Sequence, residues 1–353
     1  MRSFVDIERT FGGQPPRLGV VLARIDVGRG REELYRDQVP ELLRSLASQT
    51  RVESISASSA IEGVIVAPDR VGQLVDAGQP IRFRDRNEQE FAGYRDAVEA
   101  IVRTEPVERM SVPLILSIHR DLFRHTEVRG GYLKTDDNRI VTRDENGMRV
   151  VLFDPPPWRQ TEFLLGELVS RYNDALDHEL AHPLVLVGAF ILDFLSIHPV
   201  ADGNGRIARI LTTQTLLERG YGVSRYVSVE QRIYNTKNTY YDVLYQSQRN
   251  WHQGTHSIWP WVTYLAEILA GSYHAFEQRV AAEHRSRQTM TKQERVRLHV
   301  LEYAPPTFTI DTLRRSLPGI SDQTIRLVLA ALRHEGRIDS NGSGRNAIWR
   351  RRV

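Results

Sequence analysis

The sequence of 353 residues contains no cysteine. Disulfide bonds, cysteine-ligated zinc, iron–sulfur clusters and thiol catalysis all require that residue, so the sequence excludes each of them. Aromatic residues are well represented, with five Trp, 13 Tyr and 11 Phe. The composition therefore predicts packed apolar cores rather than a disordered chain, and the length favours two or three domains.

A long uninterrupted apolar run is also missing. The longest nearly apolar segment, Pro183–Ile197, contains Asp193 and is shorter than the roughly 20 residues that a membrane-spanning helix needs. Near the start of the chain, Asp6 and Glu8 stand where a signal peptide has its apolar stretch. We therefore expect a cytoplasmic protein with no membrane partner, in which residues 183–197 form a buried helix.

Lysine is scarce, since only Lys134, Lys237 and Lys292 are present. The accompanying arginine excess is more typical of genomic base composition than of a function. The net charge of +3 is unevenly distributed, because residues 286–353 carry 13 Arg and Lys against 6 Asp and Glu. This basic C-terminal region predicts an anionic partner for that end of the chain.

Apolar periodicity predicts a mostly α-helical fold. Helical patterns occur in the segments 17–62, 86–104, 111–124, 160–180, 183–197, 205–219, 236–248 and 259–285. One region differs, because Ile140-Val141 and Val150–Phe153 flank Asn146-Gly147, a dipeptide that strongly favours a β-hairpin turn.

The domain organisation follows from these patterns. We expect an N-terminal helical region at 1–100, a core with its following helices at 101–285, and a C-terminal module at 286–353. The polar segment Gln288–Glu294 is the candidate linker before that module.

The most informative stretch is His198–Arg209, with the sequence HPVADGNGRIAR. Pro199 prevents the preceding helix from continuing, and Gly203 and Gly205 permit a tight turn into a new helix. Several backbone N–H groups then converge at the positive end of that helix, which is a geometry that binds phosphate.

Charged side chains complete the same stretch. Arg206 and Arg209 supply charge-assisted donors for phosphate oxygens. Asp202 suits Mg²⁺, which takes one or two carboxylates together with substrate phosphates. His198 has an ordinary pKa suited to general-base catalysis. The alternative is a helical corner whose polar residues only cap and pair, but seven such residues within twelve positions favour a nucleotide site.

This stretch resembles the signature of Fic-domain proteins, His-Pro-Phe-x-x-Gly-Asn-Gly-Arg-x-x-Arg, and departs from it at Val200, where the family usually has Phe. The resemblance implies a Fic-type helical core that transfers AMP from ATP, with Mg²⁺, to a Ser, Thr or Tyr hydroxyl of a protein, including the chain itself. The related Doc-like kinases have Lys in place of the second Gly, so Gly205 argues against that branch.

The resemblance also assigns roles to individual residues. His198 would deprotonate the target hydroxyl, and Asp202 would be the metal ligand. The implied ATP-binding residues are Asp202, Gly203, Asn204, Gly205, Arg206, Arg209, Tyr240 and Tyr241. Gln248 is a weaker candidate for the pocket around the adenine.

The predicted hairpin resembles the flap with which Fic proteins hold a target backbone by strand addition. The implied target-binding residues are Asn138, Arg139, Ile140 and Val141. Lys134 stands where the family commonly has Arg, and an ordinary structural hairpin is the alternative interpretation.

The segment Ser58–Gly63 resembles the inhibitory motif of the family, Ser/Thr-x-x-x-Glu-Gly/Asn. Ser58 and Glu62 are four residues apart and therefore share one helical face. The resemblance implies that Glu62 pairs with Arg209 and thereby displaces ATP from a productive position. The alternative is a solvated glutamate near a helix end.

The C-terminal module has the sequence layout of a winged helix-turn-helix. Pro318-Gly319 separates two short helical patterns, and Arg337-Ile338 with Ala347–Arg350 would form the wing. Contact with DNA through 288–353 and protein docking or dimerisation are both open for this module.

These observations predict a protein adenylyltransferase that is autoinhibited by Glu62, and we expect a homodimer. The alternatives are an enzyme that removes AMP, another nucleotidyl transferase, or a nucleotide-sensing regulator that binds DNA.

Overall fold

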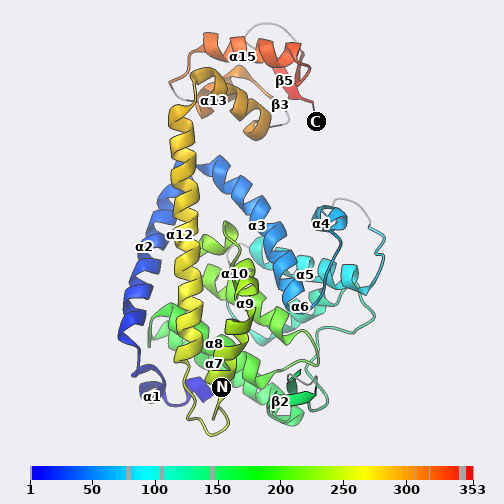
Figure 1. The fold of residues 1–353 in the computed structure, drawn as a ribbon, viewed down its shortest axis with the longest axis vertical. Helices are drawn as coiled ribbons and strands as arrows, with labels where there is room; N and C mark the ends of the chain where they lie inside the picture. Colours follow the sequence, from blue (N-terminus) through cyan, green and yellow to red (C-terminus); the bar gives the residue numbers. More distant parts are fainter. Residues whose placement is uncertain are drawn as a thin grey trace. The chain divides into compact units, whose positions relative to one another are not determined.

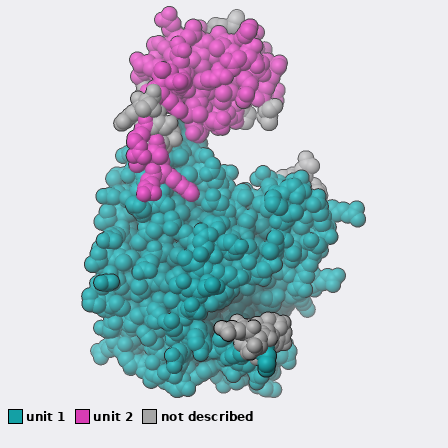
Figure 2. All heavy atoms as spheres, in the orientation of Figure 1, with its two compact units in different colours: residues 1–277 teal, residues 278–353 magenta. Residues whose placement is uncertain are grey.

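The computed structural model describes residues 2–76, 81–103, 107–143, 148–305, 307–317, 319–341 and 347–352. The chain divides into two compact units, residues 1–277 and residues 278–353 (Figure 2). Both units consist mainly of helices, and the only sheets among the described residues are small and antiparallel (Figure 1). The expectation of a mostly α fold with a small hairpin is confirmed.

The first unit contains, in order, η1 (Arg2–Phe4), α1 (Ile7–Phe11), α2 (Pro16–Gln38), α3 (Pro40–Ile61), α4 (Pro68–Val75), α5 (Arg86–Arg103), α6 (Val112–Leu122), α7 (Trp158–Asp177), α8 (Pro183–Ile197), α9 (Asn204–Glu218), η2 (Gly222–Arg225), α10 (Val229–Asn235) and α11 (Lys237–Gln248). The next helix, α12 (Trp259–Thr289), begins in the first unit and ends in the second. Prolines at the first positions of α2, α3, α4 and α8 suit helix starts, because their missing N–H would have no intrahelical partner there.

The centre of this unit is α8, which is buried from Leu184 to Ile197 and packs against α7, α9 and η1. Its one charged residue, Asp193, is fully buried and accepts hydrogen bonds from Ser3 N at 2.9 Å, Ser3 Oγ at 2.8 Å and Trp251 Nε1 at 2.6 Å. These three donors replace the water that the carboxylate loses on burial. None of the described helices is both long and apolar enough to cross a membrane.

The hairpin consists of β1 (Ile140–Arg143) and β2 (Arg149–Phe153). Ile140 pairs with Phe153 and Val141 with Val151, with an irregularity in register between the first two positions of β1. Residues 144–147, which include the predicted Asn-Gly turn, lie outside the described residues.

The second unit contains α13 (Lys292–Leu298), η3 (His299–Tyr303), α14 (Ile310–Ser316) and α15 (Asp322–His334), with a sheet of β3 (Thr307–Phe308), β4 (Ile338–Asn341) and β5 (Ile348–Arg351). The strand order is β3-β5-β4. The predicted pair of wing strands corresponds to β4 and β5, whereas β3 was not expected because two residues are too short to show an alternating pattern.

The candidate linker Gln288–Glu294 differs from expectation. Helix α12 continues to Thr289, and α13 begins at Lys292 with a capping box between Thr291 and Glu294. A polar composition is compatible with exposed helix as well as with linker, so composition alone did not separate the two.

Substituting Asp193 with Ala removes the acceptor for three buried donors. We expect the free energy of unfolding to fall by about 2–4 kcal/mol, since each orphaned donor loses its partner without regaining water. Urea unfolding followed by tryptophan fluorescence measures the change. The control, Asp242→Ala, alters an exposed residue of α11 and should change stability by no more than about 0.5 kcal/mol. Equal losses for both variants would contradict the anchoring role of Asp193.

Candidate active site

The turn between α8 and α9 holds most of the residues singled out in the sequence. His198 ends α8 in the left-handed conformation, with φ of 50°, and Gly203 precedes α9 with φ of 88°. Asn204 closes the turn, because its Oδ1 accepts from Val200 N at 3.1 Å and its Nδ2 donates to Val200 O at 2.8 Å. The side chain of Val200, where the signature has Phe, is fully buried and therefore occupies an apolar packing position.

The imidazole of His198 has a defined tautomer. Its Nδ1 lies 3.2 Å from Leu195 O, and a carbonyl oxygen only accepts, so Nδ1 carries the proton and donates it. The other nitrogen, Nε2, then has a free lone pair. Burial is the main cause that lowers the pKa of His198 to about 4; the hydrogen bond with Leu195 O opposes this change, and the positive charge of Lys134 adds to it. The side chain is therefore a neutral base at physiological pH.

A buried lysine fixes the start of this turn. The side chain of Lys134 is buried, and its Nζ donates to Asn138 Oδ1 at 2.9 Å, Pro156 O at 3.0 Å and Ile197 O at 3.2 Å. Burial lowers the pKa of Lys134 to about 8, with the charge of Asp137 opposing that change. One ammonium group thus connects the hairpin region to the last residue of α8.

Asn138 continues this connection. Its Nδ2 donates to His198 O at 3.4 Å and Val200 O at 3.2 Å, on either side of Pro199. Lys134 adds a backbone hydrogen bond, from its N–H to Pro199 O at 2.9 Å. The sequence placed Asn138 on a target-binding edge, but its amide points inward and holds the turn.

The other flap residues lie along or next to β1. Ile140 lines a cavity beside His198, Val141 is 44% exposed, and Arg139 forms an exposed ion pair with Asp154 at 3.2 Å. The side chain of Val141 is therefore accessible on the surface of the hairpin.

The cavity beside His198 has a volume of about 240 Å³ and brings together distant parts of the sequence. Its lining residues are Glu62, Ile140, Leu152, Leu195, His198, Ala201, Asp202, Gly203, Asn204, Gly205, Tyr240, Tyr241, Leu244, Tyr245 and Gln248. Tyr240 is buried with its ring 5.1 Å from that of Tyr241, which is 41% exposed. The two tyrosines and Gln248 thus line the same cavity as His198.

Arg206 and Arg209 project from α9 but are buried, with 4% and 3% exposure. Arg206 Nη1 pairs with Glu90 Oε2 at 2.7 Å, and its guanidinium lies 5.2 Å from the ring centre of Phe123. Glu90 could not be predicted as this partner, because a glutamate on a helix of mixed polarity gives no signal of a buried partner 116 residues away.

Arg209 contacts Ser58 and Glu62 at the end of α3. Its Nε donates to Ser58 Oγ at 2.7 Å, and its Nη2 donates to Ser58 O at 3.1 Å and Glu62 Oε1 at 2.9 Å. Burial alone would raise the pKa of Glu62, but the charge and hydrogen bond of Arg209 outweigh it, so this pKa lies below its ordinary value. Glu62 is therefore ionised at neutral pH.

Two further contacts position Glu62. A Cβ atom on Gly205 would lie 2.4 Å from Glu62 Oε1, so the glycine lets the carboxylate approach the start of α9. Lys237 Nζ donates to Ile61 O at 2.6 Å, which attaches the end of α3 to the first turn of α11. The sequence analysis had no signal for Lys237, because its partner is a backbone carbonyl.

The residues present fit a magnesium–phosphate complex. Asp202 has a side chain that is 57% exposed and lines the cavity, and its Oδ1 accepts from Gly203 N at 2.6 Å. No cluster of three or more His, Asp or Glu occurs within the described ranges. A single accessible carboxylate can hold Mg²⁺ when a phosphate-bearing substrate supplies the other oxygen ligands.

We predict that His198 stays neutral from pH 8 down to about 5.5. Burial holds its pKa near 4, and protonation would place a charge in a poorly hydrated turn. NMR of ¹³C-labelled histidine in the full chain measures this titration, with His198→Gln assigning the resonance. A midpoint between pH 6 and 7 would show that the imidazole is solvated.

We predict that Lys134→Met raises the pKa of His198 and that Lys134→Arg does not. The methionine removes a positive charge that lowers this pKa, whereas arginine keeps the charge. The same NMR titration measures both variants. We also expect Lys134→Met to cost about 1–3 kcal/mol of folding free energy, because three buried oxygens lose their donor. An unchanged pKa in both variants would limit Lys134 to a structural role.

Comparison with known proteins agrees with this geometry. Residues 109–216 match the family model described as "Fic/DOC family". The chain is 25% identical over 175 residues to a protein adenylyltransferase and cysteine protease, IbpA, of Histophilus somni, covering 49% of this chain and 4% of that protein. It is 27% identical over 190 residues to a probable protein adenylyltransferase of Aquifex aeolicus, covering 53% of this chain and 54% of that protein. The chain thus spans about half the length, or less, of these two relatives.

A solved structure has a similar fold. A Fic family protein from Desulfovibrio desulfuricans superimposes with a TM-score of 0.62 at 23% identity, covering 96% of each chain. A Fic domain containing signaling protein from Bacteroides thetaiotaomicron gives a TM-score of 0.58 at 21% identity, covering 71% of this chain and 94% of that one. Residues 109–216 therefore match the Fic/DOC family model, and the fold of the chain is similar to that of these two solved structures.

Proposed function

We propose that this protein transfers AMP from ATP to a hydroxyl side chain of a protein, and that Glu62 inhibits the transfer. The observation that carries the proposal is the cavity in which the neutral base His198, the glycine turn before α9 and Glu62 all meet. The relatives named as adenylyltransferases support the same class of reaction.

In the proposed reaction, His198 Nε2 accepts the proton of the target hydroxyl as its oxygen attacks the α-phosphorus of ATP. The bond from that phosphorus to the bridging oxygen breaks, and pyrophosphate leaves. Backbone N–H groups from Gly203 to Gly205 and the guanidinium of Arg206 stabilise the phosphate charge. Magnesium held by Asp202 would neutralise further charge on the phosphates.

Inhibition follows from the contacts of Arg209. Its Nη1 is buried without a hydrogen-bond partner among the described residues, while Nη2 and Nε are used by Glu62 and Ser58. A terminal phosphate that needs this guanidinium must compete with the carboxylate. Glu62 also lies against Gly205, so it occupies space beside the anion-binding turn.

The role of the second unit remains a proposal. Gln323 and Arg326 are exposed on α15, as a recognition helix requires, and Arg350 is exposed on β5. Two other arginines near the C-terminal end already have partners, since Arg351 donates to Leu301 O and Arg352 pairs with Asp339. We keep DNA contact and protein docking as the two alternatives.

Glu62→Gly should increase AMP labelling from labelled ATP at least tenfold, on the chain itself or on a target in a cell lysate. The substitution frees Arg209 from Glu62, so the terminal phosphate of ATP no longer competes with a carboxylate for this guanidinium. Coupling between two such sites is typically worth about 1–3 kcal/mol. Gel autoradiography and mass spectrometry of the labelled bands measure it. Labelling no higher than in the wild-type protein would reject inhibition by Glu62.

Adding His198→Ala to the Glu62→Gly protein should reduce the rate of AMP labelling by a factor of about 10²–10⁴, because the general base is lost. Binding of MgATP, followed by calorimetry, should persist. If the chain instead acts only as a nucleotide-sensing regulator, the double variant will retain its regulation of DNA binding. Removal of AMP from a labelled protein, assayed in parallel with wild-type protein, tests the reverse activity.

A further inference from the structure

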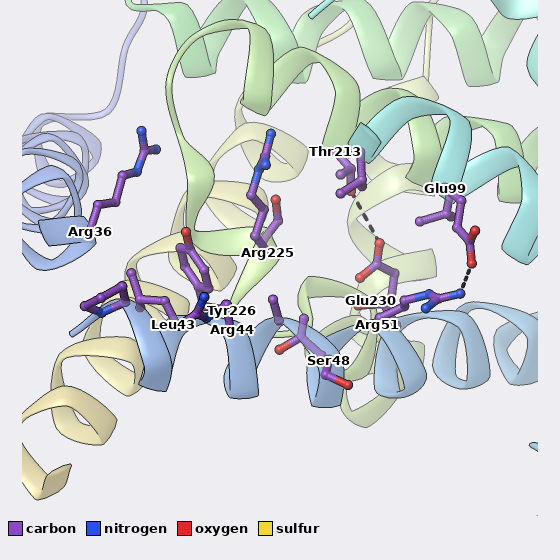
Figure 3. Close-up of a pocket in the computed structure, with 17 residues that line it drawn as sticks. Arg36, Leu43, Arg44, Ser48, Arg51, Glu99, Thr213, Arg225, Tyr226 and Glu230 are labelled. Carbon is purple, nitrogen blue, oxygen red and sulfur yellow. Dashed lines mark hydrogen bonds and ion pairs between the residues drawn. The ribbon is translucent and has the colours of Figure 1, made fainter. Parts of the chain in front are cut away.

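A second cavity, of about 570 Å³, lies among α3, α5 and the segment from η2 to α10 (Figure 3). It shares no lining residue with the cavity beside His198. Its volume is within the range of about 300–1,000 Å³ that is typical of sites for small molecules. The proposed reaction does not use it.

The wall of this cavity is largely apolar, with Leu43 and Ala47 on α3 facing Val98 and Val102 on α5. The charged part of the lining is predominantly cationic, with four arginines (Arg36, Arg44, Arg51 and Arg225) and two glutamates (Glu99 and Glu230). An occupant that suits both parts has an apolar body and a negative charge.

The charged groups differ in what they already contact. Arg51 pairs with Glu99, as Figure 3 shows, and Arg36 pairs with Glu32 at 3.2 Å. Arg44 is exposed, and no described carboxylate forms an ion pair with it. Arg44 is therefore a cation that can bind an anionic ligand without giving up a partner.

Two buried hydroxyls give an independent indication of a ligand. Thr50 and Ser224 line the cavity with exposures of 2% and 8%. Neither Thr50 Oγ1 nor Ser224 Oγ has a hydrogen-bond partner among the described residues. Buried hydroxyls normally have a partner, so these two can donate to an acceptor placed in the cavity.

We propose that this cavity is a binding site for a small amphiphilic anion, meaning a carboxylate or similar acidic group on an apolar chain or ring. Its apolar body packs between α3 and α5, and Arg44 binds the acidic group. The ligand thereby fills the space between α3 and the helices that face it.

Occupancy also affects the His198 site, and this part rests on the proposed function. Ser54 lines the cavity, donates to Ser228 Oγ at 2.9 Å, and lies one helical turn before Ser58. A ligand that fits this arrangement stabilises α3 in the position where Ser58 and Glu62 contact Arg209. In the proposed function MgATP competes with Glu62 for Arg209, so the ligand weakens the binding of MgATP. By thermodynamic reciprocity, MgATP weakens the binding of the ligand by the same factor.

Calorimetric titration of the full chain with octanoate tests the site, with 1-octanol as its uncharged counterpart. We expect octanoate to bind at least about fivefold more tightly than octanol.

Two variants test the lining residues. Ala47→Trp, which fills the cavity, should abolish octanoate binding, and Arg44→Glu should weaken it at least about tenfold. The matched controls are Ser45→Trp, on an exposed position of α3 outside the lining, and Arg24→Glu, an exposed arginine of α2. Both should bind octanoate as the wild-type protein does.

Absence of octanoate binding would overturn the proposed site, as would equal binding by wild type and Ala47→Trp. Equal affinities for octanoate and octanol would overturn the role of the negative charge.

The coupling is tested separately, by titrating MgATP with and without saturating octanoate. We expect octanoate to weaken MgATP binding about fivefold or more in the wild-type protein and not in Ala47→Trp or Glu62→Gly. Octanoate binding with unchanged MgATP affinity in the wild type would overturn the coupling alone. Failure of Glu62→Gly to increase AMP labelling would reject the proposed function and leave the octanoate result standing.

Discussion

The burial of α8 is the constraint on which the arrangement of the first unit depends. A helix that is buried on every side cannot shift along its axis without opening its contacts with α7 and α9. Asp193 adds directional hydrogen bonds to Ser3 and Trp251, which fix the helix to segments far away in the sequence. The end of α8 therefore provides a rigid position for His198.

The turn after α8 is held in place by side chains that bind its backbone. Lys134 and Asn138 hold the backbone on both sides of Pro199, and Asn204 closes the turn from within. All of these contacts go to backbone groups, so they define the path of the chain rather than the identity of its side chains. The imidazole of His198 and the start of α9 are consequently held in a fixed relation by contacts within the chain itself.

The sequence predicted the parts of the site that are close in the chain. Spacing within residues 198–209 indicated a turn, a helix start and their polar side chains, and the structure brings these together with Tyr240, Tyr241 and Glu62. Helix positions were predictable for the same reason, because apolar periodicity is a local property. The separation of Ser58 and Glu62 by four residues predicted their shared helical face.

The sequence could not predict partners that are distant and individually unremarkable. Glu90 binds Arg206 across 116 residues, and Lys134 and Lys237 bind backbone carbonyls that every residue possesses. Asn138 illustrates the same limit, since a hairpin position suggested an outward role while tertiary packing turned its amide inward. The cavity lined by Arg44 and Thr50 arises from gaps between helices, which no spacing within one helix encodes.

The contact between Glu62 and Arg209 forms within one chain, and this has a consequence for how the pair responds to its surroundings. The effective concentration of the carboxylate at the guanidinium is fixed by the fold of residues 58–62 and does not change when the protein is diluted. The fraction of molecules with this pair intact is thus set by the fold of the chain and by the ligands that it binds, and not by the abundance of the protein.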